Sequence, residues 1–314
     1  MKAPARLWWG GFVFGALVVA CGIGPSLLPD TGDGDPLHAS LLPPLSRVTL
    51  LELADGRILM SPEVTVDDDV YLVRGSRSTS SVAADEIVDQ GAVRLWLGSD
   101  RFGRDVVRRL LEGGRISLVV AALGVTVALI VGLGVGLAAA TGGRITDTLL
   151  MRTVDALLAF PILLLLILLS ALFRPGPALL IAVLGLSSWM GLARLVRGQV
   201  LSLRTRTFIQ AARVAGTRWP RMWTLHYLPN LKAPVAQDTA LQMGNLVLAE
   251  ATLSFLGLGL PATLPSWGRM VAEGQRVMID GWWLSVFPGL AITALVISLA
   301  LIGDGLQQSG DASA

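Results

Sequence analysis

The chain has 314 residues, of which 53% are hydrophobic and only 15% are charged. Because a soluble domain carries about 25% charged residues, this composition predicts an integral membrane protein. The formal net charge of +2 is too small to indicate a nucleic-acid-binding protein, and the single cysteine, Cys21, excludes an intrachain disulfide.

Apolar runs long enough to cross a bilayer recur along the chain. Crossing roughly 30 Å of hydrocarbon takes about 20 residues, so we expect about six transmembrane helices and an all-α integral membrane protein. The first run is too long for a cleavable signal peptide, and we interpret residues 1–28 as a retained helix. Within it, Cys21 is expected to be a packing residue rather than a lipid-acylation site. The expected spans are Leu7–Leu28, Ile116–Ala140, Thr148–Phe173, Ala178–Val196, Pro234–Leu256 and Leu284–Leu306.

The orientation of these spans follows from one strongly basic loop, residues 197–232. The loop contains no acidic residue, and short loops rich in Lys and Arg stay on the cytoplasmic side. Counting spans outward from it places both termini in the cytoplasm and residues 29–97 outside. The basic residues of the loop are Arg197, Arg204, Arg206, Arg213, Arg218, Arg221 and Lys232.

Residues 29–97 are expected to form a small, acidic, β-rich extracytoplasmic insert. Arg47–Met60 indicates two strands around a turn at Asp55-Gly56, and Val64–Val73 indicates one more strand. Residues 74–89 are expected to be a loop with one helical turn. The triplet Asp67–Asp69 indicates a solvated turn rather than a calcium site, because no EF-hand spacing follows it.

Residues 106–112, directly before the second span, are amphipathic. This pattern predicts a helix that lies in the membrane interface. Its apolar face consists of Val106, Val107, Leu110 and Leu111, and its polar face of Arg108, Arg109 and Glu112.

Residues 208–230 form a polar island that predicts two short helices. Thr207 is a candidate N-cap for a helix over residues 208–215, and Gly216 occupies the position where a left-handed residue ends a helix. Thr217 is a candidate cap for the second helix, which residues 228–230 are expected to end. Such a hairpin, held at the membrane by flanking spans, is typical of a docking element.

The sequence offers little for catalysis. The two histidines, His38 and His226, are expected on opposite sides of the membrane, so we expect neither a His-based metal site nor a His-based triad. There is no G-x-x-x-x-G-K-[ST] phosphate loop, so we do not expect this chain to hydrolyse ATP itself. Gly132, Gly134 and Gly136 lie inside an expected span and indicate close helix packing.

Ionisable residues inside spans are costly and indicate function first. Glu250, near the outer end of the fifth span, is the main candidate for the translocation pathway, and Asp155 is another. Pro161 is expected to kink the third span because it removes a helix hydrogen bond. The alternative is that each carboxylate, including Asp238 and Asp304, pairs with an Arg or a backbone group and fixes helix packing.

Two motifs resemble those of ABC-importer permeases. Gln210-Ala211-Ala212, Gly216 and Leu228-Pro229 resemble the EAA loop, although Gln210 replaces the usual Glu. Leu97–Asp105, with the VVRRLLEGGRISL that follows, closely resembles the signature of the C-type (DppC/OppC-like) subunit of dipeptide, oligopeptide and nickel importers. Further similar segments are DALLAFP at 155–161, EATLSFLGLG at 250–259, PSWG at 265–268, FPGLA at 287–291 and GDGL at 303–306.

The resemblance implies a type I ABC-importer permease fold over residues 98–314. It implies a bacterial inner-membrane protein that works with a second homologous permease (DppB/OppB-like), two cytoplasmic ATPases and an extracytoplasmic solute-binding protein. This chain would be non-catalytic and hold no cofactor, with ATP and Mg²⁺ on the ATPases. It places binding-protein docking at Ser266, Trp267 and Gly268. The implied ATPase-coupling residues are Gln210, Ala211, Ala212, Arg213, Gly216, Arg218, Leu228 and Pro229.

We therefore expect a permease subunit that couples ATP hydrolysis by its partners to uptake of dipeptides or oligopeptides by alternating access. Nickel or another small solute is the alternative cargo within the family. Two other classes stay open, a self-sufficient secondary transporter and a membrane-anchored sensor or scaffold that acts through residues 29–97.

Overall fold

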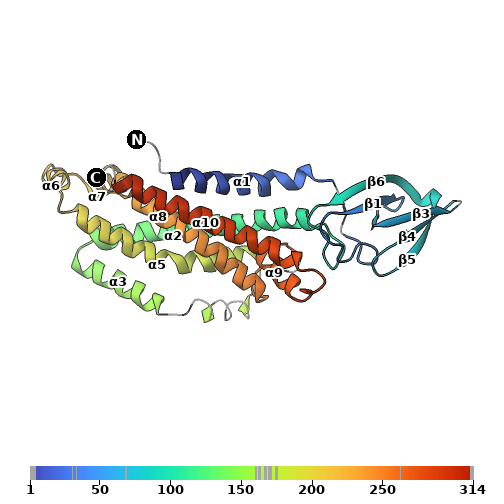
Figure 1. Cartoon of the computed structure of the whole chain (residues 1–314). Helices are drawn as coiled ribbons and strands as arrows, with labels where there is room; N and C mark the ends of the chain where they lie inside the picture. Colours follow the sequence, from blue (N-terminus) through green and yellow to red (C-terminus); the bar gives the residue numbers. More distant parts are fainter. Residues whose placement is uncertain are drawn as a thin grey trace.

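The computed structural model describes residues 5–311 apart from positions 30, 33, 68, 160, 162–163, 166–167, 169–171, 174–175 and 262. Long helices lie side by side, and a β-rich body stands at one end of the bundle (Figure 1). This mostly helical architecture with a small β insert confirms the expected fold class. The long helices are α1 (Ala5–Leu27), α2 (Val106–Thr141), α3 (Arg144–Leu158), α5 (Pro177–Leu203), α8 (Leu228–Phe255) and α10 (Trp283–Asp311).

Four of the described helices, α1, α2, α5 and α10, are long and apolar enough to cross a membrane. Helix α8 has 28 residues but a more polar sequence, and it begins at Leu228, before the expected start of the fifth span at Pro234. Pro234 lies inside α8. The expected third span begins in α3, and much of the rest lies outside the described residues.

Helix α2 is continuous over 36 residues. At 1.5 Å per residue it is about 54 Å long, well over the roughly 30 Å of hydrocarbon in a bilayer. The expected interfacial helix over residues 106–112 is therefore wrong, because these residues form the first turns of α2. Asp105 caps this end by accepting a hydrogen bond from the backbone N–H of Val107.

Glycines bring α2 into close contact with α5. A Cβ atom at Gly132 would lie 2.9 Å from the carbonyl oxygen of Trp189, and one at Gly136 would lie 2.7 Å from that of Ala193. Gly134, by contrast, has nothing within 4 Å of the same position. The expected helix-packing role therefore holds for Gly132 and Gly136, which face α5, and not for Gly134.

The insert consists of two antiparallel sheets of three strands each, with the orders β2-β1-β6 and β3-β4-β5. The first hairpin turns at Asp55 and Gly56, as the sequence predicts, and Gly56 has a φ of +81°. Alternate side chains pack inward, and Leu51, Met60 and Val73 are fully buried. The strands are β1 (Ser46–Leu53), β2 (Ile58–Ser61), β3 (Glu63–Asp67), β4 (Val70–Arg74), β5 (Thr79–Ala83) and β6 (Ile87–Leu95).

Two expectations about the insert are wrong. Val64–Val73 is a hairpin of two strands rather than one strand, and its turn falls at the Asp triplet, of which Asp68 lies outside the described residues. Residues 74–89 hold β5, one 3₁₀ turn (Ala84–Glu86) and the start of β6. Strand β5 is not predicted from the sequence because its residues are rich in serine and only Val82 is buried, so the alternation of hydrophobic and polar residues is absent.

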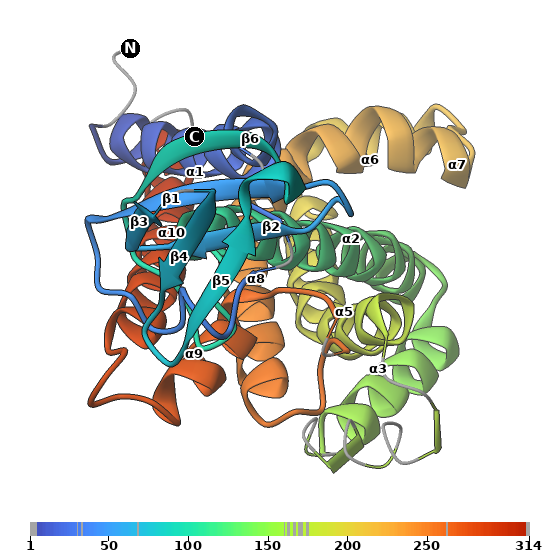
Figure 2. The ribbon, with the colours of Figure 1, turned by 90° about the vertical axis from the view of Figure 1, so that its right-hand side faces the viewer.

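The insert and the basic loop lie at opposite ends of the molecule. The loop forms α6 (Thr207–Val214) and α7 (Trp219–Met222). Helix α1 begins and α10 ends at this same end (Figure 1). Seen along the bundle, the insert lies over α1, α2 and α10, while α3, α6 and α7 stand clear of it (Figure 2).

Candidate functional site

The hairpin of α6 and α7 is the first candidate site. Its two short helices are those that the sequence predicts, but their starts differ by one residue. Helix α6 begins one residue earlier than expected, with Arg206 as its N-cap in place of Thr207, and α7 begins one residue later, with Arg218 as its N-cap in place of Thr217. Gly216 has a φ of +74°, in the left-handed region that favours glycine. The predicted helix–glycine–helix hairpin is therefore present.

One face of the hairpin is buried against the bundle. Ile209 of α6 and Met222 of α7 pack with Val196 and Val200 of α5 and with Leu137 of α2. Burial of a large aliphatic side chain is worth about 1.5–3 kcal/mol. This contact holds the hairpin on the ends of the long helices.

The other face of the hairpin is open to solvent. Gln210, Ala211 and Arg213 are exposed, and Ala212 is partly buried. The guanidinium of Arg213 lies 6.0 Å from the centre of the Trp219 ring, and the Gln210 side chain donates to the carbonyl of Thr205. The hairpin thus presents a cationic, partly apolar surface away from the bundle.

Leu228 and Pro229 do not end a helix, contrary to expectation. A five-residue π-helical segment, Trp223–Tyr227, joins α7 to α8, and the Leu228 N–H donates to the carbonyl of Trp223, five residues earlier. Pro229 has no N–H to donate and its ring crowds the preceding turn, so a wider turn fits here. Two buried groups in this segment, Trp223 Nε1 and the Tyr227 hydroxyl, have no hydrogen-bond partner among the described residues.

The second candidate site lies at the insert end of the bundle, where residues 97–105 form a compact, hydrogen-bonded loop (the knot). Ser99 donates to the carbonyl of Ala39 at 2.5 Å and accepts from the N–H of Leu42 at 2.8 Å. Trp283 of α10 donates to the Ser99 carbonyl at 3.1 Å. A Cβ atom at Gly103 would lie 2.1 Å from the carbonyl oxygen of Asp35, so only glycine fits there. The knot therefore fastens the insert to α10.

Charged side chains extend this knot to α9 (Trp267–Gln275). Arg109 donates to Asp100 at 2.7 Å and to Glu273 at 2.8 Å, and Arg104 also pairs with Asp100. Burial alone would raise the pKa of Glu273, but attraction to Arg109 and its neighbours outweighs it and holds that pKa below its ordinary value. Arg269 completes the network with a 3.2 Å hydrogen bond to Glu273.

The family that these features point to is shown by comparison with known proteins. Residues 110–312 match the family model described as "Binding-protein-dependent transport system inner membrane component". The chain belongs to this family.

Named relatives and one solved structure agree with this family assignment. A putative peptide transport system permease protein of Brucella suis biovar 1 (strain 1330) is 43% identical over 210 residues, which cover 67% of this chain and 71% of the relative. The dipeptide transport system permease protein DppC of Alkalihalophilus pseudofirmus is 39% identical over 216 residues, covering 69% and 71%. An inward-facing structure of the MetNI methionine ABC transporter matches in fold, with a TM-score of 0.52 and 19% identity, over 64% of this chain and 95% of that one.

In this permease, the residues expected to form a translocation pathway are not brought together. Glu250 is fully buried near the C-terminal end of α8, where it accepts hydrogen bonds from Ser117 and Ser254. Asp155 of α3 is half-exposed and pairs with Arg194 of α5. Pro161 is exposed and lies beyond the end of α3 at Leu158, so it follows the end of a helix rather than lying within one.

The permease also buries the residues expected to dock a binding protein. Ser266 caps α9, and Trp267 donates its indole N–H to the carbonyl of Leu110 on α2. A Cβ atom at Gly268 would lie 2.2 Å from the carbonyl oxygen of Ala251. In this conformation Ser266, Trp267 and Gly268 fix the position of α9 and are not exposed for contact with a partner.

A further cluster of polar side chains lies in the insert and was not predicted from the sequence. Asp35, His38 and Ser80 form a hydrogen-bonded series, although the sequence led us to expect no His-based triad. The reason is spacing, because Ser80 lies 42 residues after His38 and no linear motif connects them. Among the described residues, no group of three or more Asp, Glu, His and Cys side chains could hold a metal ion.

Proposed function

We propose that this permease is the membrane subunit through which an ATP-driven importer takes up dipeptides or oligopeptides. The observation that carries the proposal is the hairpin of α6 and α7, which is packed on the bundle by one face and exposed on the other. It lies at the end opposite the insert (Figure 1). The family match over residues 110–312 supports it.

The hairpin is proposed to dock in a cleft of a cytoplasmic ATPase, one of two in the importer, which bind ATP and Mg²⁺ themselves. Its coupling residues are Gln210, Ala211, Ala212, Arg213, Gly216, Arg218, Leu228 and Pro229. ATPase closure can drive the permease only if the hairpin binds the open and closed ATPases with different affinity. Ile209 and Met222 are its mechanical link to α2 and α5, because they are buried between them. In this role the chain itself carries out no catalysis.

The proposed setting is the bacterial inner membrane, with several spans and both termini in the cytoplasm. The basic hairpin favours that orientation. The insert then stands on the outer side, where a solute-binding protein would deliver cargo. A second, homologous permease subunit is proposed to complete the pathway, with Glu250, Asp155 and Pro161 as its candidate residues in this chain.

Peptides are the proposed cargo because the named relatives are peptide and dipeptide transport permeases. The docking contribution of Ser266, Trp267 and Gly268 is proposed to be indirect, through the position of α9. Trp267 is only 1% exposed, so movement of α9 would be needed to bring its side chain to a partner.

Charge reversal in the hairpin tests the coupling role. In the reconstituted importer, Arg213→Glu combined with Arg218→Glu should abolish peptide uptake and the stimulation of ATP hydrolysis by the loaded binding protein. Both side chains are exposed, so the variant should be inserted in the membrane in normal amounts. The matched control is Arg47→Glu combined with Arg77→Glu on the exposed surface of the insert. Unchanged uptake in the hairpin variant would contradict the proposal.

Gly216 offers an independent test of the same role. A Cβ atom there meets nothing within 4 Å, so Gly216→Ala acts through the backbone alone, by about 1–2 kcal/mol of left-handed strain. We expect reduced uptake with normal membrane insertion. Gly198→Ala in α5, where a Cβ atom also meets nothing within 4 Å, is the control and should transport normally. Equal uptake by the two variants would show that the turn is not part of the coupling.

A further inference from the structure

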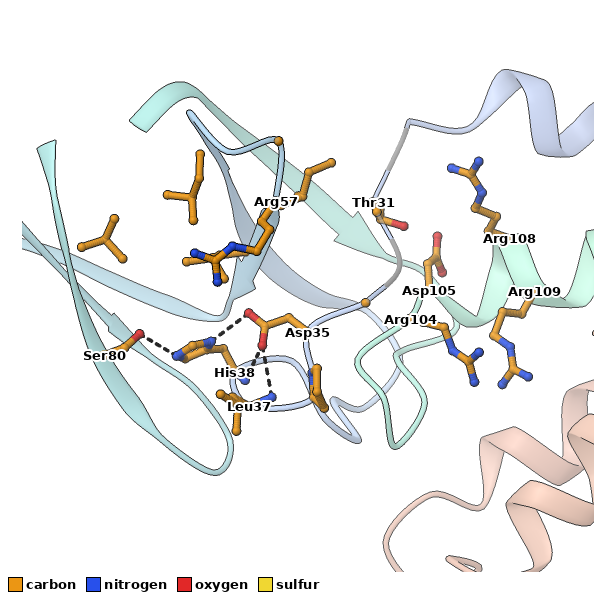
Figure 3. Close-up of a pocket in the computed structure, with 18 of the residues that line it drawn as sticks. Thr31, Asp35, Leu37, His38, Arg57, Ser80, Arg104, Asp105, Arg108 and Arg109 are labelled. Carbon is orange, nitrogen blue, oxygen red and sulfur yellow. Dashed lines mark hydrogen bonds and ion pairs between the residues drawn. The ribbon is translucent and has the colours of Figure 1, made fainter. Parts of the chain in front are cut away.

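Three side chains of the insert are arranged as a nucleophile, a base and an acid. The Ser80 hydroxyl lies 2.8 Å from His38 Nε2, and His38 Nδ1 lies 2.8 Å from Asp35 Oδ2 (Figure 3). Asp35 and His38 come from the segment before β1, and Ser80 comes from β5. This is the arrangement by which a serine nucleophile is recognised, whatever the order of the residues in the sequence.

The hydrogen bonds around Asp35 determine the direction of proton transfer. Its Oδ1 accepts from the N–H groups of Leu37 and His38, both at 3.1 Å, and its Oδ2 also accepts from the N–H of Met60 at 3.3 Å. These contacts leave Asp35 Oδ2 as the acceptor for the His38 ring nitrogen Nδ1. With the ring proton on Nδ1, the lone pair at Nε2 faces Ser80. Ser80 is in this way the donor to a general base.

The backbone holds this base rigidly. The His38 carbonyl accepts from the N–H of Ser76 at 2.9 Å, and the Leu37 carbonyl accepts from that of Arg77 at 3.1 Å. A Cβ atom at Gly75 would lie 2.0 Å from His38 Cα, so the turn after β4 fits against His38 only as glycine. The His38 side chain is almost fully buried, and its ring is thus fixed between the segment and β5.

A cavity opens in front of the three residues. It has a volume of about 1100 Å³, is lined by Asp35, His38 and Ser80, and reaches the start of α2. A ligand pocket for a small molecule has roughly 300–1,000 Å³, so an amino-acid ester or a short peptide fits. Arg57 lines the same cavity (Figure 3). Its Nε donates to Asp55 at 2.5 Å, and its terminal N–H groups are donors of the kind that stabilise a developing oxyanion.

We propose that Ser80, His38 and Asp35 form an acyl-transfer site that hydrolyses small carboxylic esters or peptides on the outer side of the membrane. Ser80 Oγ attacks the carbonyl carbon and its proton passes to His38 Nε2. The bond from that carbon to the leaving oxygen or nitrogen breaks, and the leaving group takes the proton. Water then attacks the acyl-serine, transfers a proton to Nε2, and releases a carboxylic acid as Ser80 recovers its proton.

The test is covalent labelling of the purified full-length chain with a fluorophosphonate, in which Ser80 Oγ displaces fluoride from phosphorus. Mass spectrometry of the wild-type protein should place the label on Ser80. We expect Ser80→Ala and His38→Gln to abolish labelling and Asp35→Asn to slow it at least 100-fold, since loss of the acid permits the wrong tautomer. Thr79→Ala, one residue before Ser80 in β5, is the matched control, because Thr79 is exposed and does not line the cavity, and it should be labelled normally.

A second readout is release of p-nitrophenolate from p-nitrophenyl acetate, where acylation of Ser80 predicts a burst of about one equivalent per chain. Because the label is mapped on the wild type, the result does not depend on whether any variant folds. Absence of label at Ser80, or a rate equal to that of Ser80→Ala, would overturn the proposal and leave the three residues as a hydrogen-bonded staple of the insert. Uptake by the importer is a separate measurement, so neither result decides the other.

Discussion

The guanidinium of Arg109 lies 2.8 Å from the carboxylate of Glu273, although 164 residues separate them in the chain. The same Arg109 nitrogen is 2.7 Å from Asp100. The buried Arg109 therefore links the loop of residues 97–105, which precedes α2, to helix α9. Because the knot also holds the insert through Ser99, the insert, α2 and α9 are expected to move as one body in any conformational change of the permease.

Removing Arg109 should destabilise this body strongly. Arg109→Leu leaves the buried Asp100 and Glu273 carboxylates with a cation missing, and breaking a buried pair in this way typically costs about 3–5 kcal/mol. We expect a lower free energy of unfolding, measured by thermal or denaturant unfolding of the purified protein in detergent. Arg108→Leu is the control, because the Arg108 side chain is 30% exposed, and its effect should be much smaller. Equal losses in the two variants would contradict the network.

The pH dependence of stability provides a second check on Glu273. Its pKa in the folded protein lies below the ordinary value of 4.5, so the ionised form is the one that folding favours. Its stabilising contribution is complete above that ordinary value and is lost as the pH falls through the lower, folded value. The wild type should thus be more stable than Glu273→Gln at neutral pH, and the gap between them should shrink in acid.

Unfolding midpoints of the two proteins between about pH 7 and pH 3 measure this gap. Glu63→Gln in the insert, whose side chain is 58% exposed, is the matched control and should follow the wild type closely. A gap that is constant, or that widens in acid, would show that Glu273 does not stabilise the fold through its charge.

Removing one hydroxyl from the π-helical segment should increase the stability of the protein. The Tyr227 hydroxyl is buried and has no hydrogen-bond partner in the part of the chain that the structure describes. An unsatisfied buried polar group costs about 1–3 kcal/mol, so Tyr227→Phe should raise the unfolding temperature. Tyr71→Phe is a natural control, since the chain has two tyrosines and Tyr71 lies in the insert. A loss of stability in Tyr227→Phe would mean that the hydroxyl has a partner in the folded protein.

The sequence predicts local features better than contacts through space. Gly216 was predictable because a left-handed turn between two helical patterns requires glycine, and Asp55-Gly56 was predictable as a hairpin turn for a similar reason. Strand β5 was missed because its exposed face is made of serine and threonine. The Arg109–Glu273 pair and the Asp35–His38–Ser80 series could not be predicted, because only the fold brings together segments that are distant in sequence.

Close packing of α2 on α5 can be tested with two glycines that are two residues apart. A Cβ atom at Gly136 would lie 2.7 Å from both the carbonyl oxygen of Ala193 and Val196 Cβ, while one at Gly134 meets nothing within 4 Å. Gly136→Ala should therefore destabilise the bundle by about 1–3 kcal/mol through overpacking. Gly134→Ala should be neutral or stabilise the helix slightly, because alanine has the higher helix propensity. Thermal unfolding of both variants in detergent measures the difference, and equal midpoints would contradict the close contact between the two helices.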